Sequence, residues 1–361
     1  MKIKLVESKV YRIPLAEPVQ AYAAGILDGF DMVIVKITDE DGNIGTGYTA
    51  LMKKQGLSVK DIIVEVFSDL IIGSDADLIE NLWKKMWKKH HYAGRGGTVS
   101  FAIAAVDTAL WDLKARKLNT PLWKLLGGNN NKILAYSGNI DLNFPIEKLI
   151  TQASKNINDG YKAIKMRLGR DTLKEDIERV AAVRKHIGDN IELMADANEA
   201  WRVDQAIKAS NILSEFNLTW LEEPLRPDDY AGYKLLRLKG KVPIAAGENL
   251  HTIAEFLQLF QSQGVDFPEP DFTTCGGITP FMKIAKIADA FNLPVMSHGA
   301  HEIHLSLLAA CPNAAYLEVH AFGIEDYILK PMKMENGYAV APERPGHGVD
   351  FNFEKLKQHI L

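Results

Sequence analysis

A repeated alternation of short β-rich runs and amphipathic helices spans most of the chain, from about residue 133 to residue 320. The intervening segments, such as Lys174–His186 and Phe281–Phe291, have helical composition. Strands that alternate with helices predict a parallel α/β fold, because a parallel connection needs a long crossover. The eight β-rich runs are Ile133–Tyr136, Ala163–Leu168, Ile191–Ala195, Thr219–Leu221, Ile244–Ala246, Asp266–Phe272, Val295–Ser297 and Tyr316–Val319.

The position of the polar residues distinguishes two parallel α/β architectures. Acidic and other polar residues stand at the C-terminal end of run after run. A closed barrel gathers all of these ends at one face, where its active site lies, whereas an open sheet concentrates functional residues at one switch point. The sequence therefore predicts a closed, TIM-like (β/α) barrel over residues 126–322.

The N-terminal third is organised differently, with strands first and helices afterwards. Asp41-Gly42 is a turn signal between two of the strands, because glycine tolerates a positive φ. We expect an α+β domain over residues 1–125, and a C-terminal segment, residues 323–361, that returns to it. The predicted strands are Lys4–Ile13, Met32–Thr38 and Ile44–Tyr48, and the predicted helices are Val59–Ile72, Asp77–His91 and Thr98–Lys117.

Composition excludes several classes of protein. The 361 residues are 47% hydrophobic and 24% charged, which is typical of a globular chain. The 42 Lys and Arg residues against 46 Asp and Glu residues give a net charge of −4, which provides no overall field for nucleic acid or an anionic membrane. Only two cysteines, no apolar signal core and no apolar run near ~20 residues predict a soluble cytoplasmic protein without nucleic-acid or membrane partners.

Three consecutive barrel units end in a carboxylate: Asp196, Glu222 and Glu248. Any one of them alone could be a helix N-cap or half of a surface ion pair. Three together at the same face would repel one another strongly unless a cation neutralised them. Because hard oxygen ligands with room for substrate oxygens suit Mg²⁺, we predict that these three residues bind magnesium.

Basic residues at other strand ends indicate acid–base chemistry. Lys165 and Arg167 are two positions apart, so both side chains leave their strand on the same face. Asp271 ends one run and His298 ends the next, and a carboxylate beside imidazole Nδ1 would leave Nε2 free as a base. His298, His301 and His304 recur every third residue, but the segment lacks a His-Glu-x-x-His pattern, so we favour His301 as a pocket residue over a zinc site.

Taken in order, these motifs resemble the mandelate racemase subgroup of the enolase superfamily. The resemblance covers essentially the whole chain and implies a capping domain, a (β/α)₇β barrel and a C-terminal return. It also implies Mg²⁺ on Asp196, Glu222 and Glu248, a His298–Asp271 base dyad, and a protonated Glu318 that hydrogen-bonds the substrate carboxylate. The motifs are Lys165-Met166-Arg167, Asp196-Ala197-Asn198, Glu222-Glu223-Pro224, Gly247-Glu248-Asn249, Asp271, His298 and Glu318.

The chain departs from the subgroup at Arg167, where the usual Lys-x-Lys pair has a second lysine that acts as a base. A guanidinium stays protonated and is a poor general base. A racemase needs bases on both faces of its substrate, whereas a dehydratase can manage with His298 alone. The sequence therefore predicts dehydration of a sugar acid, an aldonate or aldarate, to a 2-keto-3-deoxy acid. The alternatives are a racemase or epimerase of a 2-hydroxy acid, with Lys165 or Arg167 as second base, and a barrel that binds ligand without turnover.

Specificity is expected to come from the capping domain, because loops on a rigid scaffold commonly carry it. The candidate segments are Glu17–Phe30 and Tyr48–Gln55. A lysine of the second segment, Lys53 or Lys54, could meet a distal carboxylate, although both could equally be solvated surface charges. The predicted substrate-binding residues are Asn198, Tyr48, Lys53 and His301, and the resemblance also implies a homo-oligomer.

Overall fold

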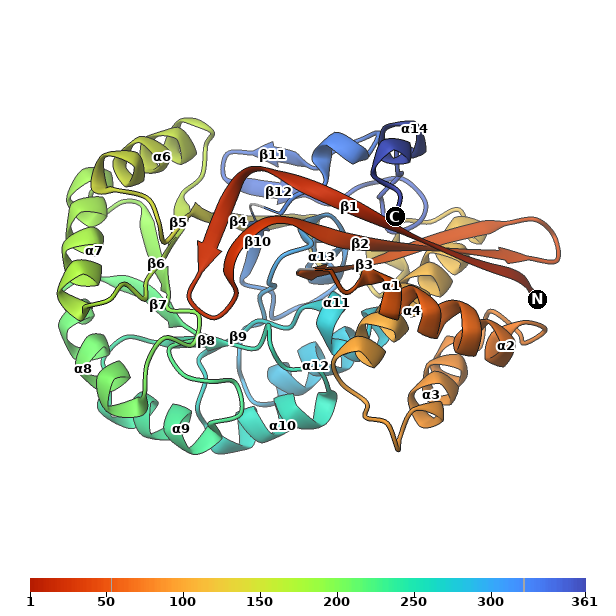
Figure 1. The fold of residues 1–361 in the computed structure, drawn as a ribbon, viewed down its shortest axis with the longest axis horizontal. Coiled ribbons are helices and arrows are strands. Elements are labelled where there is room, and N and C mark those ends of the chain that lie inside the picture. The colour runs from red at the N-terminus through yellow and green to blue at the C-terminus, as the bar shows by residue number, and fades with distance from the viewer. Residues whose placement is uncertain (53, 321) are drawn as a thin grey trace.

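The repeated segment folds into a closed parallel barrel in the computed structural model, which describes residues 1–52, 54–320 and 322–361 (Figure 1). Neighbouring strands pair in chain order from β4 to β9, and β10 returns to pair in parallel with β4. The strands are β4 (Lys132–Ile140), β5 (Ala163–Arg167), β6 (Glu192–Asp196), β7 (Leu218–Glu222), β8 (Ile244–Ala246), β9 (Phe267–Pro268) and β10 (Tyr316–His320).

The run Val295–Ser297 completes the wall between β9 and β10 without forming a full strand. Met296 N–H donates to Pro268 O at 3.0 Å, and Val295 bridges to Ala314 in parallel. The predicted closed barrel is thus confirmed, but two of its eight expected runs are shorter than predicted, because Pro268 and Pro270 cannot donate to a ladder.

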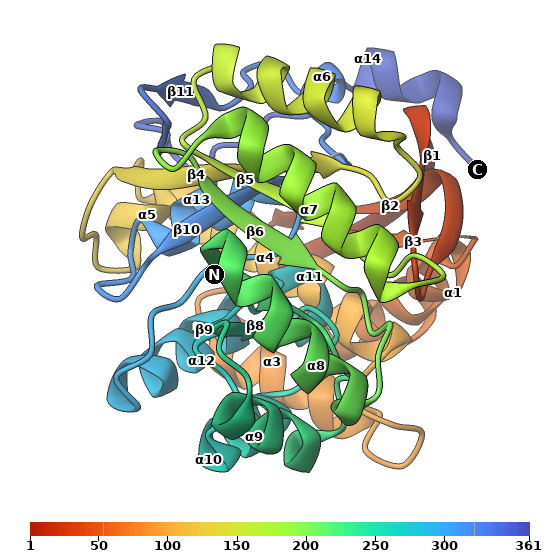
Figure 2. The ribbon, with the colours of Figure 1, turned by 90° about the vertical axis from the view of Figure 1, so that its left-hand side faces the viewer.

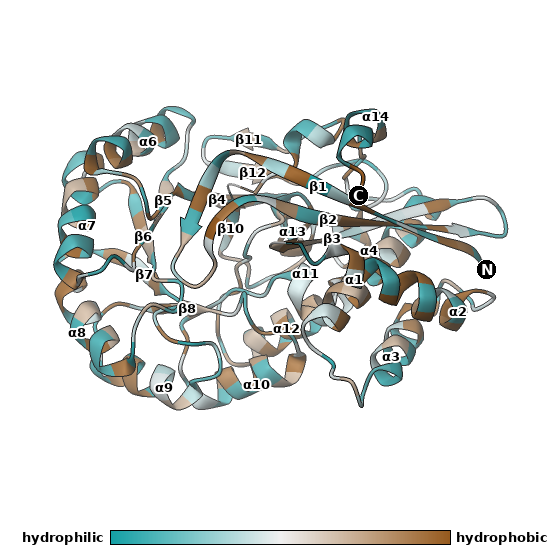
Figure 3. Cartoon of the chain, viewed as in Figure 1, coloured by the Kyte–Doolittle hydropathy of each residue, from teal (hydrophilic) through white to brown (hydrophobic). Residues whose placement is uncertain are grey.

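Helices surround the barrel on its outside (Figures 1 and 2). In Figure 3 these helices show mixed polar and apolar residues, as expected when one face packs on the strands and the other meets solvent. They are α6 (Ile146–Asn158), α7 (Leu173–Ile187), α8 (Val203–Leu213), α9 (Tyr230–Lys239), α10 (Ile253–Ser262), α12 (Ile278–Ala290) and α13 (His301–Leu308), with a short α11 (Phe272–Cys275).

Aromatic side chains fill the inside of the barrel below the site. Tyr136 and Trp220 are fully buried, with ring centroids 5.3 Å apart, and they form one cluster with Met194 and Met296. The barrel interior is therefore a packed core rather than a pore. Functional side chains can stand only at the strand ends above this layer.

The capping domain joins a three-stranded antiparallel sheet to helices. Gly45 and Gly47 of its third strand lie against the longest helix, where a Cβ at Gly47 would come within 2.3 Å of Ala105 O. Side chains at these positions would push helix and sheet apart. The elements are β1 (Ile3–Ala21), β2 (Gly25–Asp39), β3 (Ile44–Met52), α1 (Gly56–Asp61), the π-helical turn Ile62–Phe67, α2 (Ser68–Ile71), α3 (Ile79–Lys89), α4 (Thr98–Lys117) and α5 (Leu122–Leu125).

The segment Glu17–Phe30, which we expected to be a loop, is instead part of a long β-hairpin. After an irregularity between Pro14 and Val19, pairing resumes at Val19–Leu27 and ends at Ala21–Gly25. Gly25 has φ 72°, which permits the tight turn. Figure 1 shows this hairpin reaching from the cap across the barrel. Specificity residues here therefore sit on a strand-supported tip rather than on a free loop.

The C-terminal segment contacts both parts of the molecule. Its β11 (Lys333–Glu335) and β12 (Tyr338–Val340) form a hairpin that pairs antiparallel with β4, while Leu361 N–H donates to Val10 O of the cap at 3.0 Å. α14 (Phe353–Leu356) lies beside the cap sheet, where Lys36 Nζ is 3.7 Å from the Phe353 ring centroid.

The division of the chain into domains at residues 1–125, 126–322 and 323–361 stays a prediction. Among the described residues, no helix combines the length and apolarity that a bilayer span requires.

Candidate active site

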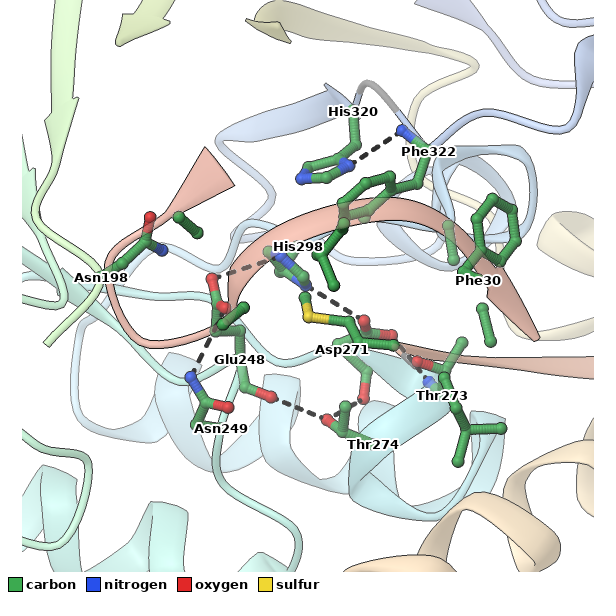
Figure 4. A pocket seen from close by; sticks show the side chains of 18 of the residues that line it. Phe30, Asn198, Glu248, Asn249, Asp271, Thr273, Thr274, His298, His320 and Phe322 are labelled. Atoms are coloured by element: carbon green, nitrogen blue, oxygen red, sulfur yellow. Dashed lines mark hydrogen bonds and ion pairs between the residues drawn. The ribbon is translucent and has the colours of Figure 1, made fainter. Parts of the chain in front are cut away.

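A cavity of about 410 Å³ lies between the cap hairpin and the C-terminal ends of the barrel strands (Figure 4). The cap contributes mostly apolar side chains to its lining, among them Ala21, Leu27 and Phe30. The barrel contributes the polar ones. Those residues are Arg167, Asp196, Asn198, Glu199, Glu223, Glu248, Asn249, His251, Asp271, Thr273, Thr274, His298 and His320.

The three predicted metal ligands stand at neighbouring strand ends and are almost fully buried. Asp196 ends β6 and pairs in register with Glu222 at the end of β7, while Glu248 follows β8. Burial raises the pKa of Glu222 to about 8; Lys165 opposes this rise, and Asp196 adds to it. Burial likewise raises the pKa of Glu248. Buried acids this close favour a bound cation, as the sequence predicted.

A fourth carboxylate, Glu269, belongs to this cluster and was missed from the sequence. Its side chain is fully buried, and both of its oxygens lack a hydrogen-bond partner among the described residues. One oxygen from each of Glu222, Glu248 and Glu269 lies within 4.8 Å of the others. Glu269 follows β9 directly, so the rule that found the other acids at strand ends could have found it.

Asp196 lies at the edge of the cluster. Both of its oxygens accept hydrogen bonds from Asn198, one from the backbone N–H at 2.8 Å and one from Nδ2 at 2.9 Å. The Oδ1 atom of Asn198 and the Oε2 atom of Glu248 have no hydrogen-bond partner among the described residues. Unpartnered, buried oxygen atoms beside ionisable carboxylates fit Mg²⁺, which prefers oxygen ligands.

Lys165 supplies the positive charge at the centre of the acids. Its Nζ contacts Glu222 Oε1, lies 2.7 Å from Glu318 Oε1, and lies 3.9 Å from Asp196 Oδ2. Burial opposes the charge on Lys165, but the facing carboxylates outweigh it and hold its pKa well above the ordinary value. Lys165 is therefore a cation in this arrangement and not a free base.

Glu318 is an acceptor here rather than the protonated donor that we expected. Its Oε2 accepts from Gly299 N–H at 2.8 Å, and its Oε1 faces Lys165. Burial alone would raise the pKa of Glu318, but Lys165 outweighs burial and lowers it below its usual range. A donating role would require Lys165 to move away from Glu318 first.

The structure brings His298 and Asp271 together as the sequence predicted. His298 Nδ1 lies 3.2 Å from Asp271 Oδ2, and Nε2 faces Glu248 Oε2 at 3.3 Å (Figure 4). Thr273 N–H donates to Asp271 at 2.7 Å and fixes its orientation. Burial lowers the pKa of His298, but Glu248 and Asp271 outweigh burial and raise this pKa to about 10. His298 can therefore act as a base only when another group neutralises the negative charge of Glu248, which otherwise holds the proton on the imidazole.

Arg167 lines the cavity and is held by two residues that the sequence analysis missed. Its Nη1 lies 3.3 Å from Asp141 Oδ1, and its Nη2 lies 3.2 Å from His320 Nε2. Asp141 also accepts the backbone N–H of Gln20, in the cap hairpin, at 2.8 Å. Asp141 follows β4 and His320 ends β10, so both obey the same strand-end rule.

The predicted substrate-binding residues have different positions. Asn198 and Tyr48 line the cavity, and the Tyr48 hydroxyl donates to Glu302 at 3.3 Å. Lys53 lies outside the described residues, and Lys54 is exposed. His301 is not among the lining residues, contrary to expectation, because its Nε2 turns to Glu325 at 2.8 Å, behind the cavity wall.

The three histidines at every third position do not converge on one point. His298 pairs with Asp271, His301 with Glu325, and His304 Nδ1 with Gly299 O at 2.7 Å. His298 precedes α13, which begins at His301, and each ring faces its own hydrogen-bond partner. The three histidines therefore share no common site, and His301 stands instead with Glu302 and Glu325, whose ligand atoms lie within 4.8 Å of its own.

Two family models together match most of the chain. Residues 5–127 match "Mandelate racemase / muconate lactonizing enzyme, N-terminal domain", and residues 148–356 match "Enolase C-terminal domain-like". Among curated proteins, a 3,6-anhydro-alpha-L-galactonate cycloisomerase from Streptomyces coelicolor is 43% identical over 354 residues, which cover 98% of each chain.

Two solved structures are similar over almost their whole length. One is a racemase from Streptomyces coelicolor A3(2) with bound magnesium, at TM-score 0.97 and 42% identity, covering 99% of this chain and 100% of that one. The other is an L-talarate dehydratase from Polaromonas sp. JS666 with Mg and L-glucarate, at TM-score 0.92 and 33% identity. The match covers 100% of this chain and 97% of that one. Magnesium is thus the cofactor, and sugar-acid chemistry is the shared activity. The chain belongs to the enolase superfamily, in its mandelate racemase subgroup.

Proposed function

We propose that this protein opens the ring of a 3,6-anhydro sugar acid by β-elimination. The observation that carries the proposal is that the cavity presents a single base dyad. His298 and Asp271 form this dyad, and the position where a second lysine base would stand is occupied by Arg167, an ion that stays protonated. One base suffices for elimination, whereas racemisation needs a proton acceptor on each face.

The residues of the chain account for each proton in the reaction. When bound, Mg²⁺ neutralises the charge that develops on the substrate carboxylate as the α-proton leaves. His298 takes that proton, the electron pair forms the bond between the α- and β-carbons, and the β-carbon–oxygen bond breaks. The proton on His298 passes to the ring oxygen. The resulting enol takes a proton at its β-carbon and becomes a 2-keto-3-deoxy acid, an isomer of the substrate.

The apolar cap wall supports a ring-shaped substrate. Among the described residues, the cap side chains that line the cavity carry no charge; they are Ala21, Ala23, Ala24, Leu27, Phe30, Tyr48, Ala50, Leu51, Met52, Gln55 and Phe101. An open-chain diacid would bury a distal carboxylate against this wall at a high desolvation cost. An anhydro ring has fewer hydroxyl groups and presents apolar CH edges. The 43% identity to a 3,6-anhydro-alpha-L-galactonate cycloisomerase supports the same choice.

Dehydration of an open-chain sugar acid is the second candidate, and it uses the same residues with a hydroxyl as the leaving group. The similarity to an L-talarate dehydratase that holds Mg and L-glucarate favours it. Racemisation or epimerisation has less support, because Lys165, the remaining candidate base, is held protonated by Glu222 and Glu318. A barrel without turnover has no support, because the named relatives are enzymes.

A substrate panel distinguishes these reactions. The protein with Mg²⁺ is incubated with 3,6-anhydrogalactonates and with linear aldonates and aldarates, and 2-keto acids are detected as semicarbazones. Ring opening yields a product of unchanged mass, whereas dehydration yields a product lighter by one water. The ring-opening proposal would be overturned if keto acid formed from the linear acids but not from the 3,6-anhydrogalactonates. Inversion at the α-carbon without keto acid would overturn elimination altogether.

The remaining expectations concern assembly and location. A homo-oligomer stays a prediction, which light scattering of the purified protein would test. Cytoplasmic location also stays a prediction, to be tested by fractionating cells that produce the protein.

A further inference from the structure

The side chain of His320 is flanked by hydrogen-bond donors on both ring nitrogens. Phe322 N–H donates to Nδ1 at 3.1 Å, and Arg167 Nη2, which carries only N–H groups, lies 3.2 Å from Nε2. A neutral imidazole can accept at one nitrogen only. The Phe322 N–H belongs to the backbone and cannot turn away, so Nδ1 is the nitrogen that accepts. Nε2 therefore carries the ring proton, and this N–H faces the N–H groups of Arg167 Nη2.

Two N–H groups that face each other need an acceptor between them. Arg167 and His320 are 7% and 6% exposed and line the cavity, so an oxygen of a bound molecule can reach both. Arg167 Nε is also buried without a hydrogen-bond partner among the described residues. Burial lowers the pKa of His320 well below its ordinary value, and the Arg167 and Lys165 charges add to the effect against the opposing influence of Glu318. The lowered pKa favours the neutral ring.

The position of this donor pair identifies the oxygen. The His320 ring lies beside that of His298, with centroids 5.4 Å apart, and both residues line the cavity (Figure 4). The α-proton of the substrate must face His298 Nε2. The β-oxygen, one carbon away, then lies near the neighbouring ring.

We infer that Arg167 Nη2 and His320 Nε2 together bind the leaving oxygen of the substrate and stabilise the negative charge that it develops. This inference rests on the proposed elimination and names two groups that touch the breaking bond. Preorganised N–H donors aimed at developing charge are a common source of rate enhancement. The proton itself still reaches the oxygen from His298, so the reaction balances as written above.

Asp141 is the positioning residue of this pair. It holds Arg167 Nη1 at 3.3 Å and is itself only 2% exposed, so the guanidinium is oriented by a buried carboxylate. Through Gln20 N–H at 2.8 Å, the same carboxylate is tied to the cap hairpin. The arginine is therefore in place when the hairpin tip lies over the cavity.

The test separates proton removal from bond cleavage. His320→Ala and His320→Gln are compared with wild type in D₂O with Mg²⁺ and the best substrate of the panel. We expect His320→Ala to lose on the order of 100-fold in keto-acid formation, while the recovered substrate gains α-deuterium that wild type does not accumulate. His320→Gln, which keeps an N–H donor, should recover part of the loss. His186→Gln, an exposed histidine of α7, is the matched control.

Two outcomes overturn the inference. If α-exchange and elimination fall in parallel in His320→Ala, with native circular dichroism, His320 has only a structural role. If elimination stays within about 3-fold of wild type, no donor is needed there. Failure of the proposed function looks different, because wild type itself would then form no keto acid from any acid of the panel.

Asp141→Asn tests the positioning role separately. We expect elimination to fall and α-deuteration to appear, as with His320→Ala but to a smaller extent, because Arg167 remains present but is less firmly oriented. An unchanged ratio of exchange to elimination would contradict this role of Asp141.

Discussion

Glu248 Oε2 lies 3.3 Å from Nε2 of His298, so a predicted metal ligand and the predicted base share one contact. The site is therefore a single electrostatic unit in which six acids, a lysine and a histidine balance one another; the acids are Asp196, Glu222, Glu248, Glu269, Asp271 and Glu318. Substitutions within it should affect metal binding and proton transfer to different degrees. This difference can be measured.

His298→Asn should remove proton abstraction but leave metal binding. Asparagine keeps a polar group near Asp271 but provides no base, and general bases contribute about 10²–10⁴-fold. We expect α-exchange and keto-acid formation to fall by that factor, while the Mg²⁺ affinity measured by calorimetry changes only a few-fold. Turnover within a few-fold of wild type would contradict the dyad.

Glu269→Gln should weaken magnesium binding. The buried carboxylate adds negative charge within 4.8 Å of Glu222 and Glu248 oxygens, and groups that support a metal site are commonly worth about 10–100-fold in affinity. Calorimetry with Mg²⁺ and Mn²⁺ measures this without turnover. Glu255→Gln, on α10 outside the cluster, is the control. Equal affinity in wild type and Glu269→Gln would show that Glu269 does not contribute to the metal site.

Arg167→Lys should shift the reaction from elimination towards inversion. The variant restores the Lys-x-Lys pair and supplies an amine that can lose its proton, but it loses the planar guanidinium that spans Asp141 and His320. We expect keto-acid formation to fall about 100-fold and α-epimerised substrate to appear in D₂O. Retained elimination with no inversion would contradict the role assigned to the guanidinium.

Asp107 should make stability depend on pH. This residue of α4 is fully buried and binds Thr279 of α12, and burial raises its pKa to about 7. Between about pH 4 and 7 the folded protein keeps a proton that the unfolded chain releases. Its contribution to stability therefore falls as pH rises, by at most about 1.4 kcal/mol per pH unit.

Urea unfolding of wild type and Asp107→Asn near pH 5 and pH 7 measures this effect. Asparagine does not titrate, so the free energy of unfolding of wild type should decrease relative to that of the variant as pH rises. A constant difference between the two proteins would show that Asp107 keeps an ordinary pKa.

Strand periodicity predicted the barrel, and the strand-end rule predicted most of the site, because parallel strands bring their C-terminal ends to one face. This rule identified six residues of the site: Asp196, Glu222, Glu248, Asp271, His298 and Arg167. Glu269 was missed because the predicted run Asp266–Phe272 extends beyond β9, which ends at Pro268, so Glu269 stood inside the expected strand and not at its end. Asp141 and His320 obey the same rule but were missed because the predicted runs ended earlier, at Tyr136 and Val319, whereas β4 extends to Ile140 and β10 to His320.

The cap was less predictable. The irregular pairing between Pro14 and Val19 hides the hairpin that replaces the expected loop, since its residues lack a regular alternation. His301 turned away from the cavity because of its partner Glu325, 24 positions later in the chain. Such contacts arise from packing between distant segments, and composition carries no signal for them.

Asp141 accepts both a hairpin amide and a guanidinium. Both contacts end on the same oxygen, Oδ1, so a displacement of the hairpin that broke the Gln20 hydrogen bond would also loosen the carboxylate that orients the Arg167 guanidinium. One carboxylate oxygen thus couples the position of the cap to the geometry of the barrel residue beneath it.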